Sequence, residues 1–509
     1  MTWFHEKSHT MEEEGGHDVS DLHWLKNHPL LLRGGSEPLR RRLYRVLRQA
    51  VVDGRLQAGA ILPSTRSLAD LLEMARNTVL YAYEQLAAEG YVRADRQGTV
   101  VCALGPRDTR TRPVATLPPL SGRSGGVQRP RSAEDQLRPF VPGNPGLDAF
   151  PWRVWQRVRA RAERQTAAHE AGYRGAGGEP ELRQAIATYL RASRGVDCGP
   201  QQVIVTEGTQ EGLALCAMLL ADAGDIAWIE HPGYGGAWAA LRAAGLRCEP
   251  VTVDMHGMAP PSALWRQSPP RLIYTTPSHQ YPLGSVLSLP RRLALLAQAR
   301  AHGAWILEDD YDSEFRHAGP PLAAMQGLEP DAPVAYLGTF SKTMFPGLRL
   351  GFVVVPAAVV DRAEGLAGAL WPRGRVADQR ALAAFIDEGH FTRHLRCMRG
   401  LYAERQQALR AALARVWRWP GTVLGGDCGM HLVISLPDAV SDVAVAAAAA
   451  EHRLGPRALS SYGTGGPAGF NGLVLGYAHM PAETVGERVR LLVQAVSQAD
   501  SAKAKAAHT

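Results

Sequence analysis

The stretch Gly338–Phe352, GTFSKTMFPGLRLGF, decides how the larger part of this chain is interpreted. It overlaps the end of the apolar run VAYLGTF, which is typical of a buried β-strand, and it then places a lysine and an arginine seven positions apart. A charged amine beside such a strand is costly unless it is neutral, paired or used covalently. The pattern therefore predicts that Lys342 is a desolvated amine able to form a Schiff base, and that Arg349 returns to the same loop.

Other strand ends in the sequence offer the groups that a pyridoxal phosphate site requires. In AWILEDDYDSEF, Asp309 would face the ring nitrogen and Tyr311 would donate to the ring oxygen, while Tyr234 in IEHPGYGGA would stack on the ring. In IVTEGTQEGLAL, a strand leads into a helix whose first amide groups would bind the phosphate. Each residue alone also has a structural explanation, but their order favours the cofactor. The expected phosphate cradle consists of Gly208, Thr209, Gln210, Thr339, Ser341 and Arg349.

The runs QVIVTEG, DIAWIE, RLIYTTP, AWILEDD and VAYLGTF alternate with helical patterns rich in alanine and leucine. This alternation predicts an α/β domain with a mostly parallel sheet that is covered by helices on both faces. We expect this domain to span residues 139–500, after a linker at 105–138 that is rich in Pro, Gly, Ser and Arg. A small domain is expected at 36–104, after a disordered tail at 1–25.

The composition sets limits on function. The chain has 509 residues and a formal net charge of +7, which permits contact with nucleic acid without requiring it. Its six cysteines form no CxxC pair, so we expect neither disulfides nor a metal site. The amino-terminal segment is polar and acidic, and we find no apolar run long enough for a membrane span. We therefore expect a cytoplasmic protein that does not interact with membranes.

The small domain has the pattern of a winged helix-turn-helix. EPLRRRLYRVLRQAVVDGRL is an amphipathic helix, PSTRSLADLLEM a second helix capped by Ser64 or Thr65, and ARNTVLYAYEQLAAEGYV a third helix that would enter the major groove of DNA. YVRADRQGTVVC would form a hairpin wing that turns at Gln97-Gly98. The alternative is that these arginines merely solvate a helical bundle. The expected DNA contacts are Ser64, Thr65, Arg66, Arg76, Asn77, Thr78, Arg93, Arg96 and Gly98.

Both domains resemble known families. LPSTRSLADLLEMARNTVLYAYEQLAAEGYV resembles the GntR-type winged helix-turn-helix and departs from its pattern mainly at Met74-Ala75, where that pattern has Val-Ser. TPSHQYPLG, LEDDYDSEF and GTFSKTMFPGLRLGF resemble the fold-type I aminotransferases. The combination, from about Glu37 to Gln498, resembles the MocR-type regulators of the GntR superfamily.

The resemblance implies specific roles. Lys342 would form the internal aldimine with pyridoxal 5'-phosphate, and Tyr281 would stand near the ring oxygen, where many aminotransferases have an asparagine. Tyr173 resembles the tyrosine that such enzymes lend to the phosphate of a neighbouring subunit, which implies a head-to-tail homodimer. A dimer also suits paired half-sites on double-stranded operator DNA.

Several functions agree with these patterns. The chain would be a transcription regulator that senses pyridoxal phosphate and controls vitamin B6 metabolism, or a regulator that responds to an amine or amino acid. It would otherwise be a true aminotransferase with an accessory DNA-binding domain, or a DNA-binding domain fused to an inactive dimerisation module. Aminotransferases of this fold hold the substrate carboxylate with an arginine in a carboxy-terminal strand, but FNGLVLGYAHM has Val474 at that position. This departure favours the pyridoxal phosphate sensor over an enzyme.

Overall fold

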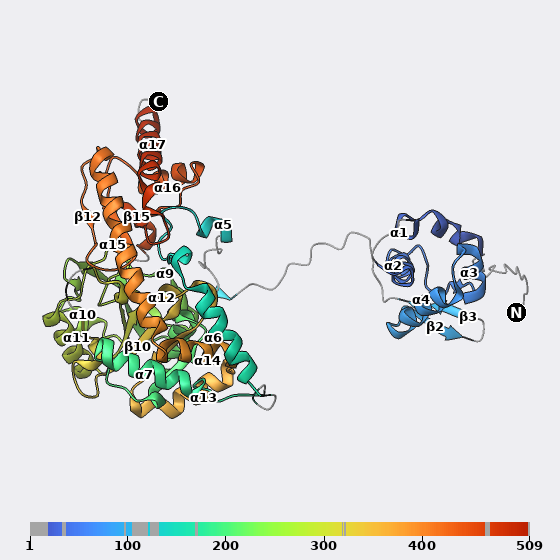
Figure 1. Cartoon of the computed structure of the whole chain (residues 1–509), viewed down its shortest axis with the longest axis horizontal. Helices are drawn as coiled ribbons and strands as arrows, with labels where there is room; N and C mark the ends of the chain where they lie inside the picture. Colours follow the sequence, from blue (N-terminus) through green and yellow to red (C-terminus); the bar gives the residue numbers. More distant parts are fainter. Residues whose placement is uncertain are drawn as a thin grey trace, which may run out of the picture. The chain divides into compact units, whose positions relative to one another are not determined.

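The computed structural model describes residues 19–32, 37–95, 98–103, 121–122, 132–167, 170, 172–317, 319, 322–463 and 469–506. The chain divides into two compact units, Met1–Pro119 and Leu120–Thr509, and Figure 1 draws both. The division falls inside the segment that the composition predicts to be a linker. Each unit is described by itself.

The smaller unit is a winged helix-turn-helix. Its strand β3 pairs antiparallel with both β1 and β2, and the apolar faces of its helices enclose a separate core that includes Leu43, Leu68 and Val79. The predicted fold of this unit is thus confirmed. Its elements are η1 (Val19–Asn27), α1 (Pro29–Leu32), α2 (Leu39–Val52), β1 (Ile61–Leu62), α3 (Thr65–Leu72), α4 (Arg76–Ala88), β2 (Val92–Asp95) and β3 (Gly98–Val101).

The structure differs from the predicted boundaries at three places. Residues 19–25, expected in the disordered tail, lie in η1, because Leu22 and Leu25 are buried in the core of the smaller unit. Residues 1–18 lie outside the described residues. Within the predicted linker, Ser132 caps the short helix α5 (Ala133–Gln136), and the final helix α17 (Ala482–Ala506) extends beyond residue 500.

The larger unit is built around an eight-stranded sheet in which β11 is antiparallel to its two neighbours and β7 is antiparallel to β6. The other neighbouring strands are parallel, as the sequence predicts. The strand order is β4 (Val203–Thr206), β11 (Gly351–Val354), β10 (Val334–Thr339), β9 (Trp305–Asp310), β8 (Leu272–Thr275), β5 (Ile226–His231), β6 (Arg247–Asp254) and β7 (Gly257–Met258).

Both faces of this sheet are buried. On β4, Val203 and Val205 belong to one apolar cluster, whereas Ile204 between them belongs to another. Since successive side chains of a strand point to opposite faces, the two clusters lie on opposite sides of the sheet. Helices surround the strands in Figure 1. The first cluster includes residues of α7 (Pro180–Arg194) and α14 (Val376–Asp387), and the second includes residues of α8 (Thr209–Leu220) and α13 (Val360–Leu370).

A second, four-stranded antiparallel sheet follows near the carboxyl end of the chain. Its order is β12 (Val423–Leu424), β13 (His431–Ser435), β15 (Gly472–Gly476) and β14 (Arg457–Ala458). Helix α17 packs against α15 (His390–Val416) and α16 (Asp442–Glu451). The remaining described elements are η3 (Leu147–Ala149), α6 (Trp152–Gln165), η5 (Pro200–Gln202), α9 (Gly235–Ala243), α10 (Leu264–Gln267), α11 (Leu289–His302), η6 (Ser313–Phe315), η7 (Met325–Gly327), α12 (Phe340–Thr343), η8 (Pro346–Leu348), η9 (Ala357–Val359) and η10 (Leu459–Tyr462).

Because most strands of the large sheet are parallel, their carboxyl ends lie at the same edge of the sheet. The carboxyl ends of β5, β8, β9 and β10 meet at the same edge of the large sheet, and β4 runs in the same direction as β10 because both are antiparallel to β11. On this edge Asp309 of β9 is paired in register with Leu337 of β10. Ligands of α/β proteins bind at such edges.

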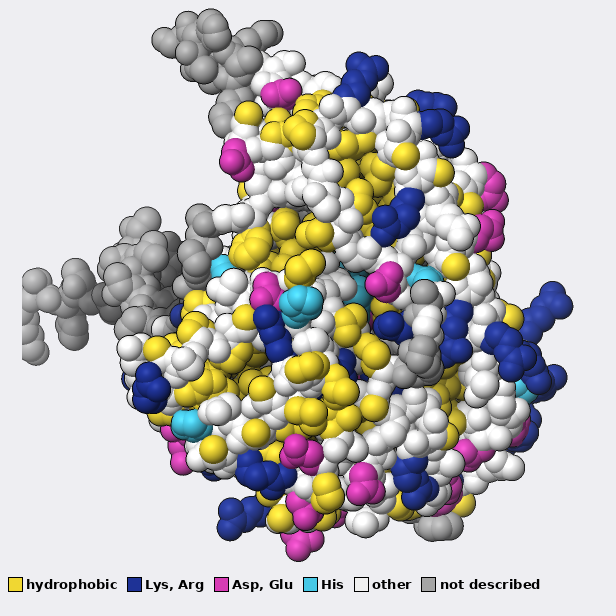
Figure 2. All heavy atoms as spheres, turned by 90° about the vertical axis from the view of Figure 1, so that its left-hand side faces the viewer, with side chains coloured by type: hydrophobic (Ala, Val, Ile, Leu, Met, Phe, Trp, Pro, Cys, Tyr) yellow, Lys and Arg dark blue, Asp and Glu magenta, His cyan; other side chains and the backbone are white. Residues whose placement is uncertain are grey.

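The surface of the larger unit carries charges of both signs. On the face shown in Figure 2, basic and acidic side chains are interspersed among apolar ones. Within the part of the chain that the structure describes, we find no helix both long and apolar enough to cross a membrane.

Candidate functional site

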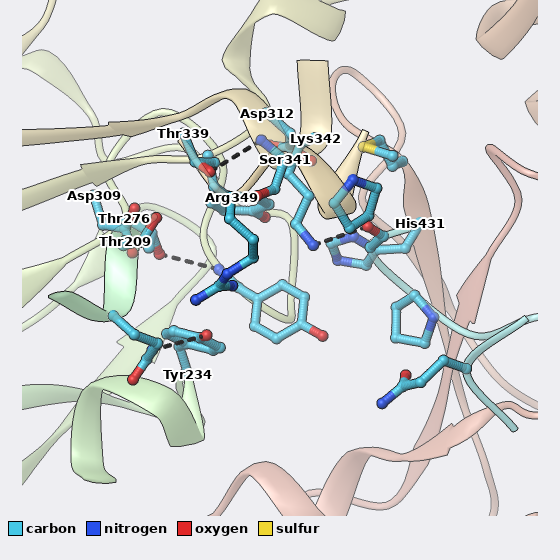
Figure 3. A pocket seen from close by; sticks show the side chains of 18 of the residues that line it. Thr209, Tyr234, Thr276, Asp309, Asp312, Thr339, Ser341, Lys342, Arg349 and His431 are labelled. Carbon is cyan, nitrogen blue, oxygen red and sulfur yellow. Dashed lines mark hydrogen bonds between the residues drawn. The ribbon is translucent and has the colours of Figure 1, made fainter. Parts of the chain in front are cut away.

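A cavity of about 420 Å³ opens at the carboxyl edge of the large sheet. Most residues predicted to contact the cofactor line it, and Figure 3 shows that Lys342 and Arg349 extend into the same space. The lining residues are Gln136, Pro142, Gly143, Thr209, Gln210, Tyr234, Tyr274, Thr276, Tyr281, Asp309, Tyr311, Asp312, Thr339, Ser341, Lys342, Pro346, Arg349, Met430 and His431.

Lys342 lies on the short helix α12, directly after β10. Its Nζ donates a hydrogen bond to the carbonyl oxygen of Gly143 over 2.8 Å. Burial lowers the pKa of the Lys342 amine, although Asp312 and Asp309 oppose this shift. Gly143 has a φ of +84°, a backbone conformation that favours glycine, and its backbone lies close to the Lys342 amine. The lysine is therefore a half-buried amine that gives up its proton more readily than a surface lysine.

Asp309 combines one satisfied carboxylate oxygen with one unsatisfied oxygen. Its Oδ2 accepts a hydrogen bond from the hydroxyl of Tyr274 over 2.7 Å, whereas the buried Oδ1 has no hydrogen-bond partner among the described residues. The side chain is only 4% exposed, and burial raises its pKa to about 7, although the hydrogen bond from Tyr274 opposes this. A buried carboxylate oxygen without a partner is costly unless a donor arrives with a ligand. The protonated ring nitrogen of pyridoxal phosphate is a donor of this kind.

The predicted phosphate cradle is assembled at the start of α8. Thr209 and Gln210 occupy its first turn, where backbone amides have no partner within the helix. Gly208 caps this helix with a φ of +86° and does not line the cavity itself, but a Cβ there would lie 3.7 Å from the Arg349 guanidinium. Arg349 donates to the carbonyl oxygen of Glu207 over 3.0 Å. A helix amino terminus beside an arginine is well suited to a phosphate group.

Thr339 and Ser341 complete this end of the cavity. The side chain of Thr339 accepts a hydrogen bond from the backbone amide of Ser341 over 3.1 Å and so caps α12. The hydroxyl groups of both residues lie in the turn that precedes Lys342 (Figure 3). Two of the residues predicted to bind the phosphate thus lie in the same turn as the Lys342 amine.

Three tyrosines, Tyr234, Tyr281 and Tyr311, also line the cavity. The hydroxyl of Tyr234 accepts a hydrogen bond from Gln210 over 3.0 Å, and its ring packs edge-on against Tyr281. The hydroxyl of Tyr281 is hydrogen-bonded to that of Tyr462 at 3.0 Å. Tyr311 lies 3.0 Å from Nδ1 of His279. In this arrangement the hydroxyl of Tyr281 faces another tyrosine, and Tyr311 is held by a histidine.

His279 and Asp312 form a buried pair behind Tyr311. Nδ1 of His279 lies 2.9 Å from Oδ1 of Asp312, and both side chains are about 1% exposed. Together with Cys428 they bring possible metal-ligand atoms within 4.8 Å of one another, although the sequence predicts no metal site. The hydrogen bonds that link Asp312, His279 and Tyr311 explain why these side chains lie close together. The pair fixes the position of the Tyr311 hydroxyl.

Tyr173 is not part of the cavity. Its side chain is 98% exposed, and its proposed contact with a neighbouring subunit stays a prediction. Sequence reasoning missed several cavity residues. Thr276 is the first residue of the TPSHQYPLG motif, which could have pointed to it, and Tyr274 lies two residues before this motif. Gly143 and His431 come from distant segments that carry no such signal.

The position where an arginine would hold a substrate carboxylate is apolar in the structure as well. Val474 lies on β15 opposite Val433, is fully buried, and packs in a cluster with Val433 and Leu459. Leu283, Tyr462 and Phe470 border this cluster. Val474 therefore belongs to a buried apolar cluster of the small sheet and is not one of the cavity-lining residues given above.

In the smaller unit, the predicted contact residues gather at the turn between α3 and α4. The side chain of Ser64 accepts a hydrogen bond from the amide of Ser67, which caps α3. Arg76, the first residue of α4, donates to the hydroxyl of Thr65 over 3.3 Å and joins the two helices. The side chains of Arg66, Arg76 and Asn77 are exposed, and Thr78 is half-buried. These cations and polar groups are free to reach phosphates and base edges.

The hairpin of β2 and β3 forms the predicted wing. Arg93 is exposed on β2 and lies 3.8 Å from Asp95, and Gly98 begins β3 with a φ of +132°. Arg96 lies outside the described residues. Arg93 is therefore the described cation of the wing that is best placed for a backbone contact.

Comparisons with known proteins agree with the two predicted domains. The family profile of aminotransferase class I and II matches residues 146–465, and that of the bacterial regulatory proteins of the gntR family matches residues 39–101. The chain is 40% identical to the probable rhizopine catabolism regulatory protein MocR of Rhizobium meliloti, over 93% of this chain and 97% of that protein. It is 35% identical to the pyridoxine biosynthesis transcriptional regulator PdxR of Corynebacterium glutamicum, over 86% of this chain and 92% of that protein.

Solved structures support the fold of the larger unit. The α-aminoadipate aminotransferase LysN of Thermus thermophilus, solved with N-(5'-phosphopyridoxyl)-L-leucine, matches with a TM-score of 0.67 at 27% identity. This match covers 74% of this chain and 97% of LysN. The fold-type I architecture predicted for the larger unit is thus confirmed.

Proposed function

The chain belongs to the MocR-type regulators of the GntR family, and on that premise we propose that pyridoxal phosphate, held at Lys342, is the ligand through which it controls transcription. The family makes it a DNA-binding transcription regulator with an aminotransferase-like domain. The observation that carries the proposal is the buried Oδ1 of Asp309, which has no hydrogen-bond partner among the described residues and lies in the same cavity as the Lys342 amine.

Different residues of the cavity would contact different parts of this cofactor. Bound pyridoxal phosphate supplies an electrophilic carbon that reacts with amines. Lys342 presents a desolvated amine, and Asp309 holds a proton at the ring nitrogen. Tyr311, which is hydrogen-bonded to His279, would donate to the ring oxygen. Tyr234 would cover one face of the ring, and Thr339, Ser341, Arg349 and the first turn of α8 would bind the phosphate.

We propose further that pyridoxal phosphate itself is the effector and that the regulated genes serve vitamin B6 metabolism. The similarity to PdxR, whose name refers to pyridoxine biosynthesis, supports this assignment. The higher identity to MocR, whose name refers to rhizopine catabolism and not to pyridoxine, keeps open the alternative of a regulator that responds to an amine or amino acid. The buried Val474 argues against an ordinary aminotransferase, because that reaction requires a clamp for the substrate carboxylate.

We propose that the protein acts as a head-to-tail homodimer. Tyr173 supports this arrangement, because an aromatic side chain that is 98% exposed gains from burial against a second subunit. In the dimer its hydroxyl would reach the phosphate site of the partner. Two winged helices would then be available for two half-sites of an operator.

The first experiment measures whether the cofactor controls DNA binding. Fluorescence anisotropy at one fixed salt concentration would give the operator affinity with and without pyridoxal phosphate. We expect a change of about 5- to 150-fold, which is the range of typical allosteric couplings. Lys342→Ala should abolish both the change and the visible absorbance band of the bound cofactor. Equal affinities of the wild type, with the cofactor demonstrably bound, would reject cofactor sensing.

The second experiment tests whether α4, the helix predicted to enter the major groove, contacts DNA. Arg76→Ala should weaken specific binding by about 1–3 kcal/mol if the side chain reads a base, or reduce the salt dependence if it contacts phosphate. Arg415→Ala, an exposed arginine of the larger unit, is the matched control. Unchanged operator affinity of the Arg76 variant would remove this residue from the DNA interface.

A further inference from the structure

Residues 63–65 join two parts of the smaller unit that are predicted to contact DNA. They follow β1, which pairs antiparallel with the wing strand β3. They lead into α3, which begins at Thr65 and is capped by Ser64. The position of this short segment therefore determines where the amino terminus of α3 lies and where the wing is attached.

Helix α4 holds this segment at two points. The hydroxyl of Tyr83 donates a hydrogen bond to the carbonyl oxygen of Pro63 over 2.9 Å, and Arg76 donates to the hydroxyl of Thr65. Because Arg76 and Tyr83 are seven residues apart, they lie on the same face of α4, two turns from each other. Both bonds thus connect the helix predicted to enter the major groove with the start of α3.

The bond from Tyr83 is buried, whereas the bond from Arg76 is exposed. Tyr83 is 5% exposed and Pro63 is buried, while Arg76 lies at the surface expected to face DNA. Burial raises the pKa of Tyr83, so its hydroxyl stays protonated and can donate. Because proline has no amide hydrogen, its carbonyl oxygen is the backbone group through which Pro63 can be held.

Contact with DNA would affect these two bonds differently. If the guanidinium of Arg76 turns to a phosphate or a base, it gives up the hydroxyl of Thr65. The bond between Tyr83 and Pro63 involves neither of the predicted DNA contacts in this pair and needs no new partner. It can therefore keep residues 63–65 in place while the surrounding side chains bind DNA.

We propose that Tyr83 is a positioning residue for operator recognition, whose hydroxyl holds the amino terminus of α3 and the attached wing at a fixed distance from α4. Tyr83 itself would not touch DNA, since it is buried. A surface that is already ordered loses less conformational freedom on binding, so this bond contributes to operator affinity. The inference rests on the proposed contacts of α3, α4 and the wing with DNA.

Tyr83→Phe in the full-length protein removes the hydroxyl and retains the ring. We expect operator affinity, measured by fluorescence anisotropy, to fall by about 2- to 12-fold, the factor that one hydrogen bond supplies. The affinity for non-operator DNA should stay unchanged, because it depends on charge, which this substitution retains. A lower free energy of unfolding with an unchanged ratio of the two affinities would show a merely structural role and overturn the inference.

Tyr44→Phe is the matched control. The hydroxyl of Tyr44 donates to the carboxylate of Glu89 over 2.6 Å, at the opposite end of α4 from Arg76. This substitution removes a hydrogen bond of the same kind without releasing residues 63–65, so operator affinity should equal that of the wild type. An equal loss of operator affinity in both variants would contradict a specific role of Tyr83.

Hydrogen exchange of the DNA-free wild type tests the same idea without a substitution. The amides of Ser67 and Leu68 donate to the side chain and the carbonyl oxygen of Ser64, over 3.1 Å and 2.9 Å, and so report whether Ser64 is held in place. We expect their protection to lie within about tenfold of that at the centre of α4. Much weaker protection would overturn the inference even if Tyr83→Phe failed to fold.

The outcomes also separate this inference from the proposed interface. If Arg76→Ala weakens operator binding and Tyr83→Phe does not, the role of Tyr83 is rejected and the interface stands. If neither substitution changes operator affinity, the assignment of α4 to the DNA interface is rejected as well.

Discussion

Asp309 illustrates how a single side chain is prepared for a ligand. Tyr274 satisfies one of its oxygens, and the other is buried without a partner among the described residues. The order of the sequence motifs predicted Asp309, since an acidic residue at the end of a buried strand is conspicuous. Tyr274, which orients it, was not predicted, because a tyrosine inside a buried strand reads as a core residue.

Replacing Asp309 by alanine should weaken the retention of pyridoxal phosphate. The change deletes a hydrogen bond between charged groups, which contributes roughly 1.5–3 kcal/mol. Equilibrium dialysis against the cofactor would measure the loss. Asp254→Ala, which removes a surface carboxylate bonded to Arg291, should leave the affinity unchanged. An Asp309 variant with the affinity of the wild type would show that another carboxylate meets the ring.

At the scale of elements, the two helices α3 and α4 of the helix-turn-helix differ in their amino-terminal caps. Ser64 caps α3 through the amide of Ser67, whereas Ala75 stands at the cap of α4 and makes no side-chain hydrogen bond. Ala75 occupies the place where the GntR pattern has serine. Helix α4 therefore begins without a side-chain partner for its first amide groups.

Two substitutions test these caps. Ser64→Ala should lower the free energy of unfolding of the smaller unit by about 0.5–2 kcal/mol, and Ala75→Ser should raise it by about 1 kcal/mol. Urea denaturation of the isolated smaller unit, which has its own core, would measure both. A serine at position 75 that leaves the stability unchanged would show that its side chain does not reach the helix amides.

The elements also show what a sequence can and cannot predict. The apolar runs predicted β4, β5, β8, β9 and β10 and hence the parallel sheet, because buried strands have a simple pattern. The same reasoning did not find the short strands β12 and β14, which are two residues long and depend on pairing with β13 and β15. Nor did it find Gly143, since a carbonyl group is common to every residue type.

At the scale of the whole molecule, buried carboxylates concentrate near the carboxyl end of β9. Burial raises the pKa values of Glu308, Asp309 and Glu314 each to about 7. Their ordinary values lie near 4, so between about pH 4 and pH 7 these three groups bind more protons in the folded protein than in the unfolded chain. Their contribution to the free energy of unfolding therefore falls as the pH rises, whereas His394 and His431, whose pKa values burial lowers to about 4 and about 3, contribute in the opposite direction.

We therefore expect Asp309→Asn to raise the free energy of unfolding of the cofactor-free protein, relative to the wild type, more at pH 8 than at pH 5, because a buried carboxylate is ionised only in the wild type at pH 8. Urea denaturation of both cofactor-free proteins at these two pH values would measure the difference. A difference between the two proteins that is the same at pH 5 and at pH 8 would contradict the raised pKa of Asp309.

The hydrogen bond from Lys342 to Gly143 joins two parts of the larger unit that are far apart in the sequence. Gly143 follows directly on the segment that begins with α5, where the described chain resumes after the linker. Any reaction that consumes the lysine amine therefore also changes the hydrogen bond that holds Gly143, in the first part of the larger unit after the linker.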